Sequence, residues 1–130
     1  MSDLKTELVN RLIEEDKESL FKMTDLTPKR TGLKVVIWSE QQGFTRNKPD
    51  NEKRFKIDGN DFSLSLSLEE KPKILAQSGK IKQSDKSAIK EAIDYVTRNL
   101  DLFLKHYNST PFEFDDDDLK EALRERGDYK

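Results

Sequence analysis

The chain has 130 residues, with 24 lysines and arginines against 26 aspartates and glutamates, one histidine and no cysteine. This length predicts one domain, residues 1–130, with a single hydrophobic core. The lack of cysteine excludes disulfides and thiolate catalysis, and a lone histidine cannot complete a zinc site within one chain. No apolar run approaches the roughly 20 residues of a membrane span, and the first residues lack a signal-peptide pattern. We therefore expect a soluble, cytoplasmic protein with no membrane contact.

The first predicted element is an amphipathic helix over residues 1–24. Leu4, Leu8 and Leu12 recur at helical spacing, and Ser2 or Asp3 would cap its start. Turn-forming residues then dominate 24–32, which we expect to end this helix and lead into the next element.

Residues 33–78 are predicted to form an antiparallel sheet of three or four strands. The β-branched and aromatic run 33–38 is typical of a central strand, and an exposed loop is expected over 41–52. Alternating runs at 53–57 and 62–68 flank Asp58-Gly59, which predicts a hairpin. The second run places leucines on one face and serines on the other. Residues 73–78 favour a fourth strand.

Residues 84–108 show the clearest helical periodicity in the chain, which predicts one long helix across the apolar face of the sheet. Ser84 is the expected N-cap. A shorter helix is expected over 115–126, with its first turn charged by aspartates, and residues 126–130 are expected to fray. The predicted fold is therefore α+β, an antiparallel sheet covered by a long helix and flanked by N- and C-terminal helices.

Basic and aromatic residues gather between positions 29 and 56, where eight bases face three acids. One interpretation is a nucleic-acid site in which lysines and arginines follow the phosphate backbone and an exposed aromatic ring stacks on a base. Its predicted residues are Phe44, Arg46, Lys48, Lys53, Arg54 and Lys56. The other interpretation places Trp38 and Phe55 in the core and the bases on a solvated outer face.

Four consecutive aspartates, Asp115, Asp116, Asp117 and Asp118, form the strongest charge run in the chain. Consecutive carboxylates at this position are typical of a charged helix start. They could instead form an acidic patch that binds a basic partner. Their spacing lacks the alternation and the glycine of a calcium loop, so we predict no metal site.

Catalytic chemistry is not predicted. His106 lies in the last turn of the predicted long helix, where we expect it to be partly exposed, and no serine lies in a nucleophile elbow with flanking glycines. Phosphate-binding glycine loops and zinc-protease motifs do not occur in the sequence. We therefore expect neither an enzyme nor a cofactor.

The order of elements in the middle of the chain resembles that of a family of small prokaryotic proteins of unknown function. This order is a strand, a loop, residues 52–57, the segment 74–81 (Ile-Leu-Ala-Gln-Ser-Gly-Lys-Ile) and a leucine-rich helix through 99–104. Members occur in toxin–antitoxin-like or mobile-element gene pairs, which implies a bacterial or phage accessory protein. The resemblance covers about 35–108. The family's paired histidines before the second strand are absent from 43–50, so no role of that segment is carried over.

Two functions follow from these patterns. The first is a non-catalytic protein-interaction or regulatory module, whose partner is another protein or a second copy of the chain in a homodimer. Its surface would include the serine-lined face of 62–68 or the terminal helices. The alternative is a nucleic-acid-binding protein that uses the basic loop and strand over 46–56.

Overall fold

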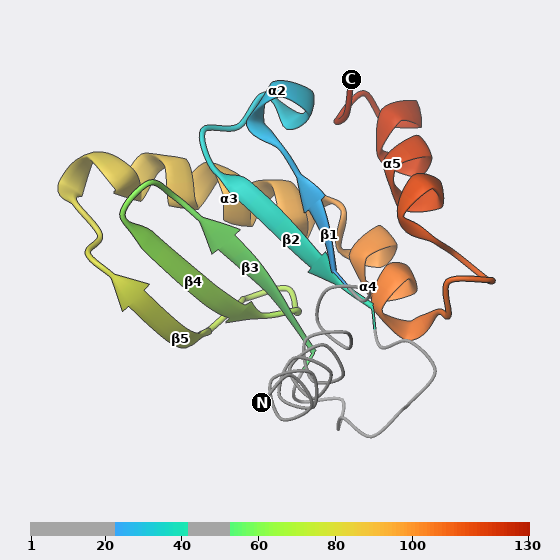
Figure 1. Cartoon of the computed structure of the whole chain (residues 1–130), viewed down its shortest axis with the longest axis horizontal. Coiled ribbons are helices and arrows are strands. Elements are labelled where there is room, and N and C mark those ends of the chain that lie inside the picture. Colours follow the sequence, from blue (N-terminus) through green and yellow to red (C-terminus); the bar gives the residue numbers. More distant parts are fainter. Residues whose placement is uncertain (1–22, 42–52) are drawn as a thin grey trace, which may run out of the picture.

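The computed structural model describes residues 23–41 and 53–130, and it has an α+β fold. A five-stranded antiparallel sheet has the order β1-β2-β3-β4-β5, so each strand lies beside the next one in the chain (Figure 1). The strands are β1 (Met23–Leu26), β2 (Val36–Glu40), β3 (Arg54–Asp58), β4 (Phe62–Ser67) and β5 (Ile74–Gly79). Helices α3 (Lys86–Arg98) and α4 (Leu100–Asn108) cover one face of this sheet (Figure 1).

The sheet has five strands, so the prediction of three or four was wrong. The missed strand is β1, which lies at the end of the predicted first helix and the start of the predicted connection. Four residues that include Asp25 give only a short and weak strand pattern, but Leu26 pairs with Ile37 of β2 and is fully buried. Pairing with β2 therefore decides its conformation. The turn-forming residues that follow make the short helix α2 (Pro28–Thr31). Residues 1–22 of the helix predicted over 1–24 and most of the loop predicted over 41–52 lie outside the described residues.

The predicted hairpin around Asp58-Gly59 joins β3 to β4, and the Gly59 amide donates to the Phe62 carbonyl at 3.0 Å. Alternation along β4 places Phe62, Leu64 and Leu66 against the helices. The facing side chains of β2 and β3 continue this layer, since Ile37 pairs with Ile57 and Ile57 with Leu64. The core lies between this layer and α3 and α4.

The opposite face of the sheet, which we call the open face, carries the alternate side chains of the strands. Most of them are half-buried, and none of the described helices lies over it (Figure 1). Its strand residues are Met23, Asp25, Val36, Trp38, Glu40, Arg54, Lys56, Asp58, Ser63, Ser65, Ser67, Ala76 and Ser78.

The single long helix predicted over 84–108 is two helices, which is a correction. A 3-10 turn, η2 (Gln83–Asp85), precedes α3, and the chain bends at Asn99 between α3 and α4. Asn99 is fully buried, and its side-chain amide donates to the Tyr95 carbonyl at 3.0 Å and to Asp128 Oδ2 at 2.9 Å. The Tyr95 carbonyl thus accepts from both the backbone amide and the side-chain amide of Asn99, at 3.2 and 3.0 Å. Apolar periodicity continues through the bend, so the sequence pattern does not reveal it.

The final helix, α5 (Asp116–Glu125), starts near the predicted position with Asp115 as its N-cap. The residues after it are held in place, so the expectation of a frayed end was wrong. Arg98 donates to both oxygens of Asp128, at 3.3 and 3.0 Å, and the Lys130 amide donates to the Arg30 carbonyl at 2.9 Å. Tyr129 is buried. The end of the chain therefore lies beside α2, as Figure 1 shows.

Two carboxyl groups of this C-terminal contact should make the protein less stable in acid. Burial opposes ionisation of Asp128, but hydrogen bonds from Arg98 and Asn99 prevail and lower its pKa. The hydrogen bond from Arg126 lowers the pKa of Asp101. Because both pKa values lie below those of the unfolded chain, this stabilisation is complete above about pH 4 and is lost as pH falls through the folded values.

Thermal unfolding followed by circular dichroism between pH 6 and pH 3 checks this expectation. The wild type should exceed an Asp101→Asn/Asp128→Asn variant in melting temperature at pH 6, and the difference should shrink toward pH 3. A difference in melting temperature that stays constant from pH 6 to pH 3 would contradict the stabilisation by ionised Asp101 and Asp128.

Candidate functional site

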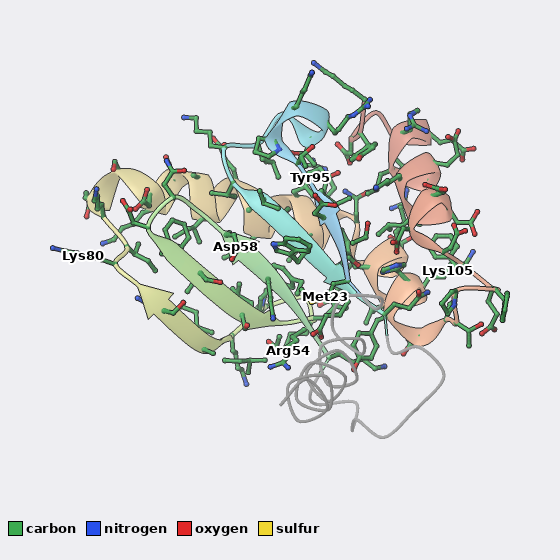
Figure 2. All side chains as sticks on the ribbon, viewed as in Figure 1. Met23, Arg54, Asp58, Lys80, Tyr95 and Lys105 are labelled. Atoms are coloured by element: carbon green, nitrogen blue, oxygen red, sulfur yellow. The ribbon has the colours of Figure 1, made fainter. Side chains whose placement is uncertain are left out.

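The predicted nucleic-acid residues are only partly within the structure, because Phe44, Arg46 and Lys48 lie outside the described residues. Arg54 and Lys56 share the open face, and Figure 2 shows Arg54 and Asp58 at opposite ends of β3. The Lys53 ammonium instead lies 5.9 Å from the centre of the Tyr107 ring. Of the three predicted residues that the structure describes, two therefore lie on the same face of the sheet.

The two aromatic residues of this region occupy different environments. Phe55 is fully buried beneath the helices, as the core interpretation predicted. Trp38 is half-buried on the open face, directly opposite Lys56, and its indole N–H donates to Asp58 Oδ2 at 2.7 Å. The core interpretation was therefore wrong for Trp38. This ring is the one large aromatic group among the described strand residues of the open face.

The described part of the open face is not basic. Its cations are Arg54 and Lys56, and Arg54 Nε lies 3.5 Å from Glu40 Oε2. Its anions are Glu40, Asp58 and Asp25, of which Asp58 also accepts from Ser63 Oγ at 2.5 Å. Nucleic-acid binding relies on an excess of positive charge along the path of the phosphates. The described residues of this face do not supply that excess.

The four consecutive aspartates lie at the start of α5, where most of them contact their own chain. Asp115 and Asp118 form a reciprocal capping box, with the Asp118 amide donating to Asp115 Oδ1 at 2.8 Å and the Asp115 amide donating to Asp118 Oδ2 at 3.0 Å. Asp116 lies beside His106, and Asp117 is exposed. These contacts are those of a helix cap, and the partner-binding patch stays a prediction.

An arrangement of Ser39, His106 and Asp116, of which the first two are buried, was not predicted from the sequence. Ser39 Oγ lies 2.8 Å from His106 Nδ1, and His106 Nε2 lies 3.1 Å from Asp116 Oδ1. His106 is fully buried, so the expectation of partial exposure was wrong. No local pattern predicts this arrangement, because the three residues come from β2, α4 and α5 and meet only when these elements pack.

The chemistry of this arrangement differs from that of a hydrolase. A nucleophilic serine must reach the substrate, but Ser39 is 1% exposed and lies within the sheet between Thr24 of β1 and Phe55 of β3. Close by, Gln41 Nε2 donates to the Phe114 carbonyl at 2.7 Å. These bonds hold the end of β2 to the connection between α4 and α5, which is a structural role. Over residues 23–41 and 53–130, no group of three or more histidines and acids could hold a metal ion.

Strand β5 is the least covered element of the sheet. All six of its residues are exposed, and it lies at the outer border of the sheet in Figure 1. The Lys80 amide donates to the Asp61 carbonyl at 2.9 Å, so these two residues form a hydrogen-bonded pair. In an antiparallel ladder hydrogen-bonded and non-hydrogen-bonded pairs alternate, which makes Ser63 with Ser78 a bonded pair and Leu64 with Gln77 a non-bonded pair. By this alternation Gln77, opposite Leu64, directs its amide and carbonyl away from β4. A second non-bonded pair, Leu66 with Ile74, follows the irregularity near Ser65.

The outer edge of β5 is therefore a free strand edge, and within the described ranges no residue pairs with it. The exposed side chains on it include two large apolar ones, Ile74 at 59% and Leu75 at 47%. The opposite edge strand differs, because β1 has four residues and its Thr24 and Leu26 are buried. Proteins commonly shorten or cover an edge strand, since an uncovered edge can pair with another chain.

Comparisons with protein-family models, curated proteins and solved structures found no match to this chain. The resemblance to small prokaryotic proteins thus stays a prediction. No helix in the described part of the chain is long and apolar enough to cross a membrane. The candidate site is therefore chosen from the geometry of the structure alone, and the free edge of β5 is the feature that most favours binding.

Proposed function

We propose that this protein is a non-catalytic protein-interaction module that binds an extended segment of a partner at the free edge of β5. The observation that carries the proposal is the exposure of all six residues of a paired strand. An added strand satisfies peptide groups that otherwise face water, and its main-chain hydrogen bonds give affinity independent of a deep pocket.

Exposed apolar side chains on β5 also favour the binding of a partner strand at this edge. Ile74 continues the row of buried side chains formed by Phe55 and Leu66, but the helix layer leaves it 59% exposed. A strand alongside β5 would cover part of Ile74 and Leu75. Removing such side chains from water contributes about 25 cal/mol for each Å² of apolar area.

The serine-lined face of β4 lies next to this edge. Ser63 pairs with Ser78 and Ser65 with Ala76, so the open face carries small side chains where β4 meets β5. A partner with large side chains on that side of its strand would meet no bulky group there. The predicted serine-lined surface thereby becomes part of the proposed interface.

Gln77→Pro is the variant that tests the edge. Proline removes the outward N–H of a residue whose amide is not bonded to β4, and an edge strand tolerates it there. Gln77→Thr keeps the N–H and strand propensity, and serves as the matched control. Retention of a partner from a lysate of the source organism should be equal for wild type and Gln77→Thr, and about tenfold lower for Gln77→Pro.

Circular dichroism and melting temperature establish that both variants fold. Equal retention by all three proteins, or retention of nothing by any of them, would contradict strand addition at β5.

The nucleic-acid alternative is tested on the same proteins. Trp38 is the only tryptophan of the chain and lies on the open face, so its fluorescence reports on ligands there. Quenching by short DNA or RNA at low salt, reversed by added salt, would favour the alternative. Our proposal predicts no such change.

A further inference from the structure

We infer that the segment accepted by β5 is an extended strand with apolar residues at its centre and acidic residues at both ends. This inference rests on the proposed strand addition and specifies its partner. It is carried by the charges that surround the edge, by their spacing along the strand and by the exposed side chains between them.

The charged side chains within β5 and the residues that directly flank it are all positive. Residues 71–82 contain four lysines and no acid, although the whole chain has a net charge of −2. Two of the lysines precede the strand and two follow it, and all four are exposed: Lys71, Lys73, Lys80 and Lys82. Figure 2 shows Lys80 extending away from the body of the protein at the end of β5.

Most of this positive charge is not neutralised within the described part of the chain. Lys82 Nζ lies 3.2 Å from Asp61 Oδ2, and the other three lysines form no ion pair with a described residue. Glu69 and Glu70 precede the segment, and Glu69 accepts a hydrogen bond from Ser67. The edge thus presents an apolar centre between two positive ends.

The spacing sets the length of the partner segment. Lys73 and Lys80 are seven positions apart, which is about 23 Å at the rise of an extended strand. Acidic side chains six to eight residues apart on an added strand would lie beside these two lysines. The side chains between them would lie beside Ile74 and Leu75.

A second copy of this chain is a poorer occupant. Pairing of β5 with β5 of another molecule would bring together eight lysines from two copies of residues 71–82, without an acid in either segment. Like charges across strands are destabilising. Flanking lysines are also a common protection of strand edges against self-association. An acidic partner converts the same lysines into attractive contacts.

Three labelled peptides test the inference by fluorescence anisotropy. Each has a central Val-Thr-Val-Thr-Val run, flanked on both sides by two glutamates in the first and by two lysines in the second. The third has the glutamates and a proline at the central valine. The first should bind at least about tenfold more tightly than the others at low salt, and the preference over lysine flanks should narrow as salt screens the charges.

Charge reversal should reverse this preference. Lys73→Glu/Lys80→Glu is expected to bind the lysine-flanked peptide more tightly than the glutamate-flanked one. The control Lys29→Glu/Lys34→Glu makes the same change in net charge at exposed positions outside the β5 segment, and should keep the wild-type preference. Gln77→Pro should lose binding of the glutamate-flanked peptide.

Each contrary outcome has a separate meaning. Equal binding of the acidic and basic peptides overturns the inference about charge but leaves strand addition in place. If the proline-containing peptide binds as tightly as the first glutamate-flanked peptide, charge attracts the peptide without strand addition. A dimer in sedimentation that Gln77→Pro abolishes makes a second copy the occupant. If no peptide binds while capture from the lysate still depends on Gln77, the inference fails and the proposed function stands; loss of both results overturns both.

Discussion

Replacing His106 with alanine is expected to lower the free energy of unfolding by about 3 kcal/mol, which combines a cavity with two lost hydrogen bonds. His106 is fully buried, and its ring lies between Ser39 of β2 and Asp116 of α5. The variant would leave Ser39 Oγ buried without the ring nitrogen that now lies 2.8 Å away. It would also remove the contact of the ring with Asp116 in the first turn of α5.

Urea unfolding followed by circular dichroism measures this loss. Lys90→Ala, an exposed position of α3, is the control and should change stability by less than about 0.5 kcal/mol. Ser39→Ala should cost about 1 kcal/mol, since it removes one hydrogen bond without a large cavity. A loss below 1 kcal/mol for His106→Ala would show that the arrangement does not hold the elements together.

Asn99 and Asp128 should be energetically coupled, and each change to alanine should cost about 2 kcal/mol. Asn99 is fully buried at the bend between α3 and α4, and it donates to Asp128 at 2.9 Å. It also accepts from Arg126 Nη1 at 3.2 Å. Removing either residue leaves polar groups of the other without these bonds.

A double-mutant cycle separates coupling from two independent losses. The combined variant should be destabilised by about 1 kcal/mol less than the sum of the two single variants. Strict additivity would contradict a direct contribution of the bond. Lys130 is a useful control, since it contacts Arg30 through its backbone and Lys130→Ala retains those main-chain atoms.

The features predicted correctly are those that local sequence specifies. Asp58-Gly59 favours one turn type, and Phe62 to Ser67 alternates so regularly that only one register buries its apolar side chains. Consecutive aspartates at 115–118 predict a charged helix start, and the structure forms it with a capping box between Asp115 and Asp118. Such signals depend on neighbours in sequence, so they can be read without the fold.

The candidate site was only partly predictable. The pattern of residues 73–78 predicts a strand, but it does not distinguish an edge strand from an inner one. Exposure of β5 depends on how far α3 and α4 extend over the sheet, which is a property of helix packing. The side of the sheet on which Trp38 lies could not be predicted either. A strand with apolar residues on both faces does not indicate which face the helices cover.

By itself the sequence determined the fold class, the central hairpin, the position of α5 and the absence of disulfides, since each depends on composition or on contacts between near neighbours. Tertiary structure alone decided β1, the bend at Asn99, the burial of His106 and the free edge of β5. These four features depend on residues far apart in the chain, such as Ser39 and His106 or Asn99 and Asp128. The free energy that stabilises these features comes from packing between distant segments and not from local conformational preference.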